Sequence, residues 1–183
     1  MKNVKTLKHQ RGDFLVGLMI AIVIVSILGA GYWINLRDGQ RDIEVKETIS
    51  KVNMTAAALR ATFGINGQYA DVTTAVAVQS RAIPQDQRIS GTNTAQNSFG
   101  GLISVTPVTL TSANDAILLT YPNVSPWACA RTVIGTQNSA RQITIGGTTV
   151  KALDATISNT DLTTACDVDE PVTIAWSIGR TGA

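Results

Sequence analysis

A run of 23 residues without a charged side chain or a histidine, from Phe14 to Leu36, constrains this 183-residue chain more than any other feature. At about 1.5 Å per residue, a helix of this length spans about 34 Å, enough to cross the hydrocarbon core of a bilayer. Tyr32 and Trp33 lie near its end, where amphipathic aromatic side chains favour the membrane–water interface. The run is too long for the apolar core of a cleaved secretory signal, and no clean Ala-x-Ala site follows it. The pattern therefore predicts a single transmembrane helix over residues 13–36.

A short basic segment precedes the apolar run and predicts its orientation. Its charged residues, all before Asp13, are Lys2, Lys5, Lys8 and Arg11. Because basic flanks stay in the cytoplasm, we expect the rest of the chain to lie in the periplasm or outside the cell. Four of the 15 basic residues belong to this segment, which leaves 11 basic against 13 acidic residues from Asp13 onward. That balance argues against a nucleic-acid partner.

Apolar residues continue at helical spacing beyond the uncharged run. They recur every three or four positions as Val45, Ile49, Val52, Ala56, Leu59 and Phe63. Glu47 and Lys51 lie on the remaining face at the favourable i,i+4 spacing. No proline interrupts residues 13–63, and Gly64 supplies a stop. The sequence thus predicts one helix over residues 13–63, apolar all round over 13–36 and amphipathic over 37–63.

Residues 64–183 predict a globular head of mixed helix and sheet. Residues 64–101 are loop-like, and strand-like runs follow at 102–105, 116–121, 142–145, 148–150 and 172–178. Gly146-Gly147 fits a hairpin turn, and the last run is rich enough in β-branched residues for a central strand. Ser125 and Pro126 open a short helix that Gly135 closes. We therefore expect an α+β fold in which the long helix packs on a mostly antiparallel sheet.

Few residues are suited to catalysis or to holding a metal. The only histidine, His9, lies in the basic segment, and the chain has no Gly-x-Ser-x-Gly, dinucleotide or phosphate-loop motif. An acidic group before the last strand fits a solvated turn better than a cation site: Asp167, Asp169 and Glu170. Three aromatic residues fit the core better than a ligand-stacking site: Tyr121, Trp127 and Trp176. We predict no enzymatic activity, no metal and no cofactor.

The only two cysteines are Cys129 and Cys166. In a chain with an export-like N-terminus they predict one disulfide in an oxidising compartment, and a pair of buried free thiols is the alternative. A redox-active pair does not fit, because the cysteines lack CxxC spacing and no histidine lies near them in sequence.

The junction Gln10-Arg11-Gly12-Asp13-Phe14 adds a family resemblance. A short basic leader that ends in glycine, followed by an apolar segment with phenylalanine second, resembles the type III signal of type IV prepilins. The resemblance implies that a prepilin peptidase cleaves between Gly12 and Asp13 on the cytoplasmic side. Residues 1–12 are then removed, Asp13 becomes the N-terminus, and the apolar segment remains in the product.

One position departs from the family pattern. Type IV pilins usually carry a glutamate at the fifth mature position, which pairs with the N-terminal ammonium of a neighbouring subunit, and here that position is Gly17. An unpaired charge in an apolar filament core is costly. We expect Asp13 to supply the compensating carboxylate beside the new amine. The alternative is that Gly17 marks a minor or divergent pilin.

Four landmarks in the head narrow the resemblance. They are Arg81-Ala82-Ile83-Pro84, Asn97-Ser98-Phe99-Gly100-Gly101, Trp127-Ala128-Cys129 and Ala165-Cys166. Their order and spacing resemble type IVb pilins, among them bundle-forming pilin and the thin-pilus subunits of conjugative plasmids, although that family often has proline where this chain has Ser98. The resemblance implies a type IV pilin fold with the apolar half of the helix protruding and the C-terminal region closed by a Cys129–Cys166 disulfide.

The implied function is that of a structural subunit of a type IVb pilus. The precursor would span the inner membrane with its leader cytoplasmic and its head periplasmic, and then join an extracellular homopolymer for conjugation, adhesion or aggregation. The implied partners are copies of itself, prepilin peptidase and the pilus assembly machinery, and the family often has a methylated N-terminus. A minor pilin or a type II secretion pseudopilin is one alternative. A signal-anchored periplasmic binding or enzymatic domain is an alternative of another class.

Overall fold

The computed structural model describes the backbone of residues 10–64 and 69–179, and their side chains apart from those of residues 10–15 and 27–37. The chain divides into two compact units, Met1–Asp42 and Ile43–Ala183. Helix α1 (Gln10–Phe63) contributes residues to both units. It ends at the predicted residue and begins three residues before the predicted start, a difference that is common for helix boundaries.

The first unit contains α1 up to Asp42. Its described large apolar side chains are between 47% and 71% exposed: Val16, Leu18, Met19, Ile20, Ile22, Val23, Ile24 and Val25. The Ser26 hydroxyl donates to the Ile22 carbonyl at 2.7 Å, so this polar group is satisfied within the helix. Within the part of the chain that the structure describes, no helix has an apolar stretch long enough to cross a membrane. The predicted transmembrane segment, residues 13–36, lies partly outside the described side chains.

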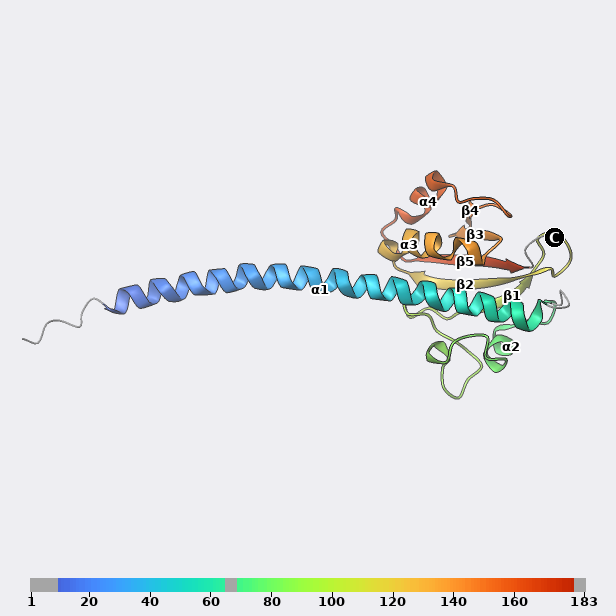
Figure 1. The fold of residues 1–183 in the computed structure, drawn as a ribbon, viewed down its shortest axis with the longest axis horizontal. Coiled ribbons are helices and arrows are strands. Elements are labelled where there is room, and N and C mark those ends of the chain that lie inside the picture. The colour runs from blue at the N-terminus through green and yellow to red at the C-terminus, as the bar shows by residue number, and fades with distance from the viewer. Residues whose placement is uncertain (1–9, 65–68, 180–183) are drawn as a thin grey trace, which may run out of the picture. The chain divides into compact units, whose positions relative to one another are not determined.

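The second unit is built on a five-stranded sheet whose strand pairs are all antiparallel (Figure 1). The spatial order is β1-β2-β5-β3-β4, so the last strand is central, as predicted. The strands are β1 (Ser104–Val108), β2 (Ala116–Val124), β3 (Gln142–Ile145), β4 (Thr148–Lys151) and β5 (Val172–Gly179). The β3–β4 hairpin also matches the prediction. Its Gly146 and Gly147 have φ of 56° and 91°, which a type I′ turn requires.

β1 and β2 differ most from the predicted strands, whereas β4 and β5 each end one residue later than predicted. β1 begins at Ser104 rather than at Leu102 and includes Pro107, which is tolerated because β1 is an edge strand where a missing N–H does not break the sheet. β2 continues beyond Tyr121 to Val124, with a shift in its register against β5 between these two residues. β1 is thus shifted toward the C-terminus, and the added residues of β2 pair with β5 rather than with β1.

The core lies between one face of the sheet and the end of α1, which runs alongside β2 and β5 (Figure 1). Of the predicted apolar stripe, Val45, Val52, Ala56 and Leu59 are at most 1% exposed, and Ile49 and Phe63 are partly buried against the same cluster. Arg60 fixes this end of the helix: its guanidinium donates to the Ser139 carbonyl at 2.7 Å and to the Gly179 carbonyl at 3.2 Å. The stripe prediction is confirmed.

Three further helices and two 3₁₀ turns complete the head. α3 (Pro126–Thr136) follows Ser125 as predicted and continues into η2 (Gln137–Ser139). Residues 64–101, predicted as loop, contain the short α2 (Thr74–Gln79) and η1 (Gln85–Gln87). A fourth helix, α4 (Asn159–Cys166), was not predicted. Its Thr-rich sequence has low helix propensity, and the N-cap at Ser158 was the available signal.

Candidate functional site: the disulfide-closed region and the processing junction

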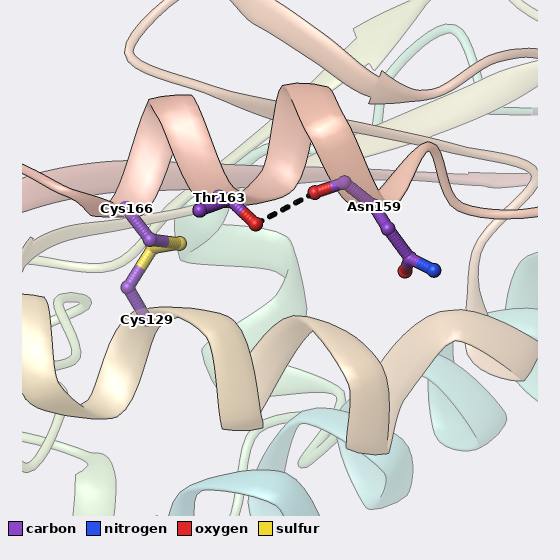
Figure 2. The surroundings of a disulfide bond; sticks show 4 residues. All are labelled: Cys129, Asn159, Thr163 and Cys166. Carbon is purple, nitrogen blue, oxygen red and sulfur yellow. Dashed lines mark hydrogen bonds between the residues drawn. A yellow bond between two sulfur atoms is a disulfide. The ribbon is translucent and has the colours of Figure 1, made fainter.

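A disulfide joins Cys129 of α3 to Cys166, the last residue of α4 (Figure 2). The two Cα atoms are 5.7 Å apart, and 37 positions separate the cysteines in sequence. Cys129 is fully buried, and Cys166 is partly buried against the core. The predicted pairing is confirmed, and the alternative of two free thiols is excluded. The bond holds two helices from distant parts of the sequence side by side.

α4 buries few of its side chains against the head. Leu162 is its one buried residue, at 4% exposed. Ser158 caps its N-terminus by accepting from the Asp161 N–H at 3.4 Å, and the Thr163 hydroxyl donates back to the Asn159 carbonyl at 2.8 Å (Figure 2). These two bonds lie within the helix, but the Ser158 N–H also donates to the Val150 carbonyl at 2.8 Å and joins the start of α4 to β4. The disulfide fixes the other end of the helix.

Polar side chains tie the enclosed region together at its base. The Arg141 guanidinium donates to the Asp154 carboxylate, with Nε 3.0 Å from Oδ1, and the Asp154 N–H donates to the Arg141 carbonyl at 2.8 Å. The hydrogen bond from Arg141 lowers the pKa of Asp154 below its usual value. The Lys151 ammonium donates to the carbonyls of Gln137 and Ala140, and its burial lowers its pKa. β4 is thereby joined to the turn after α3.

α3 approaches α1 more closely than most side chains would allow. A Cβ on Gly135 would lie 2.5 Å from the Ile49 Cδ1 and 2.9 Å from its Cγ1. The prediction that Gly135 ends α3 was wrong, because the helix continues to Thr136 and this glycine instead permits the close contact. The Trp176 indole N–H donates to the Thr136 hydroxyl at 2.8 Å, which joins α3 to the central strand.

A second irregular region, residues 64–101, is held by side-chain hydrogen bonds. Asn97 is 5% exposed. Its amide donates to the Pro122 carbonyl at 2.6 Å and accepts from the N–H groups of Phe99 and Gly101, both at 2.9 Å. A Cβ on Gly101 would lie 2.3 Å from the Pro122 carbonyl oxygen, so only glycine fits there. Within the segment 97–101, Asn97 is thus a buried polar anchor.

Lys51 connects the same region to α1. Its ammonium pairs with Glu47, as the sequence predicts, and with Asp86 of η1, both at 2.5 Å. Burial acts to lower the pKa of Lys51, but hydrogen bonds with Asp86 and Glu47 outweigh it and the pKa is raised. The hydrogen bond from Lys51 lowers the pKa of Asp86. The pair therefore favours the charged form of both groups.

The three aromatic residues considered in the sequence are packed in or against the core. Tyr121 and Trp176 are at most 1% exposed and meet edge to face with ring centroids 5.3 Å apart. The Tyr121 hydroxyl donates to Gln87 at 3.2 Å and accepts from it at 3.1 Å, and burial raises the pKa of Tyr121 to about 12. Trp127 is only partly buried, and its ring meets that of Phe99 edge to face with the ring centroids 6.1 Å apart. The core assignment is confirmed for Tyr121 and Trp176 and holds in part for Trp127.

The acidic group before β5 fits the predicted solvated turn, since Asp167, Asp169 and Glu170 are all exposed. Over residues 10–64 and 69–179, within the side chains that the structure describes, no three His, Cys, Asp or Glu residues are grouped to hold a metal ion.

The predicted processing junction lies at the start of α1. The side chains of Asp13 and Phe14 are outside those that the structure describes, so their assigned roles stay predictions. Gly17 is described, and a Cβ added there would meet no atom within 4 Å. The chain by itself thus has room for the glutamate that the family carries at this position.

Known proteins are similar to this chain in both sequence and fold. A family model described as PilS N terminal matches residues 42–179. The structure is similar to that of a type IVb pilin from Salmonella typhi, with a TM-score of 0.59 and 21% identity over 73% of this chain and 99% of that chain. It also matches TcpA, a type IV pilin from the Vibrio cholerae El Tor biotype, with a TM-score of 0.46 and 16% identity over 72% and 98% of the two chains. No curated protein matches the chain.

Proposed function

The chain belongs to the PilS family and has the type IV pilin fold of the type IVb subclass, and we propose that it is processed after Gly12 and polymerised into an extracellular filament. The observation that carries this proposal is the combination of a disulfide-closed α+β head with a helix whose described large apolar side chains between Val16 and Val25 are largely exposed. A family of structural subunits also fits the absence of catalytic motifs from the sequence.

The exposed apolar surface of α1 requires an apolar environment both before and after assembly. Eight large apolar side chains between Val16 and Val25 are about half exposed or more, which is unfavourable in water at roughly 25 cal/mol per Å² of apolar surface. In the precursor, the inner membrane covers this surface, with the basic leader in the cytoplasm and the head in the periplasm. After cleavage by a prepilin peptidase, the same surface packs against copies of itself in the filament, and the pilus assembly machinery supplies the work of extraction.

The N-terminal charge needs a partner in such a filament. We assign that role to the Asp13 carboxylate, because position 17 has glycine where the family carries a glutamate. An Asp13→Ala chain should then be cleaved normally but assembled poorly. The matched control is Asp13→Ala combined with Gly17→Glu, which restores a carboxylate at the family position, where a Cβ has open space. Filament yield should recover in the double variant.

Cells that lack the chain, complemented with each variant, give the test. The sheared filament fraction is quantified against the cleaved fraction in whole cells, and filaments are imaged by electron microscopy. The proposal is supported if wild-type chain is found in sheared filaments and is lost from them when the prepilin peptidase is deleted. Normal filament yield from Asp13→Ala alone would remove the charge assignment and leave the subunit proposal standing. Mating, adhesion and aggregation assays on the same cells then identify what the filament does.

A further inference from the structure

A cavity of about 460 Å³ lies between the end of α2 and the turn that follows η1, and neither cysteine lines it. Its volume falls in the range of roughly 300–1,000 Å³ that is usual for ligand sites. Two arginines line it, Arg81 and Arg88, and none of its lining residues is acidic. Arg81, Ser90 and Gly91 are exposed at its edge, so a ligand has access from solvent.

Arg88 presents a donor without an acceptor. Its Nε is closed off from solvent and has no hydrogen-bond partner among the described residues, so an anion in the cavity reaches it only if the Arg88 side chain moves. The backbone on both sides is fixed, since the Arg88 N–H donates to the Gln85 carbonyl at 3.2 Å and the Ile89 N–H donates to the Thr94 carbonyl at 3.0 Å. A buried cationic N–H without an acceptor is destabilising, and such groups need an explanation when they occur.

Arg81 occupies a backbone position that normally selects glycine or asparagine. It is the left-handed residue that ends α2, with φ of 59°. The flanking bonds are those of a Schellman motif: the Ala82 N–H donates to the Ala77 carbonyl at 3.0 Å, and the Arg81 N–H donates to the Val78 carbonyl at 3.1 Å. A residue with a Cβ, such as arginine, is strained at this positive φ relative to glycine. Residues with backbone strain of this kind cluster at ligand sites.

The neighbouring carboxylate does not line this cavity. Asp86, which lies between the two arginines in sequence, pairs with Lys51 at 2.5 Å and lines a smaller pocket together with Arg88. The residues that line the cavity include two arginines and two hydroxyl residues, Ser90 and Thr92, but no carboxylate. Guanidinium forks match the geometry of phosphate and sulfate oxygens, with charge-assisted hydrogen bonds that are stronger than neutral ones.

We propose that this cavity binds a tetrahedral oxyanion, a phosphate or sulfate group carried by a ligand outside the cell, through Arg81 and Arg88. Such a site gives the head a ligand of defined chemistry in addition to its structural role. It depends on the geometry of residues 78–92 and not on filament formation. The proposed function and this site therefore fail or succeed independently.

The test is a titration of the full chain in detergent micelles with sodium phosphate or sodium sulfate at constant ionic strength, followed by the NMR signals of arginine Nε–Hε groups. We expect a saturable shift of the Arg88 signal with at least one of the two anions. Arg81→Gln and Arg88→Lys should each weaken binding about tenfold, the effect of losing one hydrogen bond to a charged group. The matched control is Arg131→Gln on the exposed side of α3, which should leave the affinity unchanged.

Arg81→Gly separates binding from folding. It places the residue that the turn prefers at φ of 59°, so the variant should unfold no more easily than wild type and yet bind the anion about tenfold more weakly. A shift that does not saturate with either anion would overturn the proposal. An equal loss of affinity in Arg131→Gln would do the same, because it would indicate nonspecific attraction of anions.

Discussion

Residues 69–101 consist of short helices and turns, whereas residues 129–166 also contain strands β3 and β4, and different bonds hold the two regions. The first region is anchored by polar side chains that reach distant backbone or charged groups, chiefly Asn97 and the Lys51–Asp86 pair. The second is closed by the Cys129–Cys166 disulfide and tied at its base by Arg141 and Asp154. The first therefore depends on its polar anchors, whereas the second combines a covalent closure with buried core residues such as Ile143, Val150 and Leu162. Variation at the exposed positions of α4 should be tolerated better than variation at Asn97.

The largest expected effect comes from removing the covalent closure. The double variant Cys129→Ala/Cys166→Ala should lose up to about 4 kcal/mol of unfolding free energy, because the unfolded chain regains the entropy of a 37-residue loop. Urea unfolding of the full chain in detergent, followed by tryptophan fluorescence, measures the loss. A reducing agent should reproduce it in the wild type and do nothing further to the double variant.

Limited proteolysis sharpens the comparison between the two regions. Under reducing conditions, cleavage should begin near α4, which has Leu162 as its one buried residue, and should leave residues 69–101 intact. If cleavage began within residues 69–101 instead, the disulfide would not stabilise residues 129–166 specifically.

The next effect is expected at the polar anchor of the first region. Asn97→Ala leaves the Phe99 and Gly101 N–H groups and the Pro122 carbonyl without their partner, and we expect it to cost about 2–3 kcal/mol. Chemical unfolding measures it. The matched control, Asn93→Ala, lies at an exposed position and should change the unfolding free energy by less than about 0.5 kcal/mol. Equal losses in the two variants would show that Asn97 is not an anchor.

A smaller effect is expected at the contact between α3 and α1. Gly135→Ala gains about 1 kcal/mol of helix propensity but places a Cβ 2.5 Å from Ile49, and overpacking costs about 1–3 kcal/mol. The net loss should be about 1 kcal/mol. Adding Ile49→Ala removes the clash, so the two changes should be strongly non-additive in a double-mutant cycle. Additive losses would contradict the close approach of α3 to α1.

The smallest effect concerns pH. The lowered pKa of Asp86 means that its contribution is present above its unfolded pKa of about 3.8 and is lost as the pH falls through the lower folded value. Because the Asp86 side chain is 54% exposed, the contribution should be below about 1 kcal/mol. Lys51→Met should remove this part of the acid dependence of unfolding, whereas Lys46→Met, at an exposed position, should keep it. An unchanged acid dependence in Lys51→Met would disprove the coupling.

The features that the sequence predicted correctly share strong local signals. The apolar stripe ending at Phe63, the Gly146-Gly147 hairpin and the central strand 172–178 each have a periodicity or a turn that one structure satisfies best. The Cys129–Cys166 bond followed from there being only two cysteines in a chain of exported type. These features account for the long helix α1, the central strand β5 and the disulfide.

What the sequence did not reveal depends on tertiary contacts. α2 has six residues and α4 is rich in threonine, so neither has enough helix propensity to be evident alone. Gly135 looked like a helix stop, and only the position of Ile49 shows that it is a contact point. The cavity at Arg81 and Arg88 also arises from folding, because a left-handed arginine cannot be identified from its neighbours in sequence.

The central claim, that this chain is a processed and exported pilus subunit, is tested most directly by the intact mass and N-terminal sequence of protein sheared from the surface of its native host. We expect a chain that begins at Asp13 and lacks two hydrogens, with the mass of one CH2 group added if the N-terminus is methylated. A chain found only in the membrane and still beginning at Met1 would contradict the account.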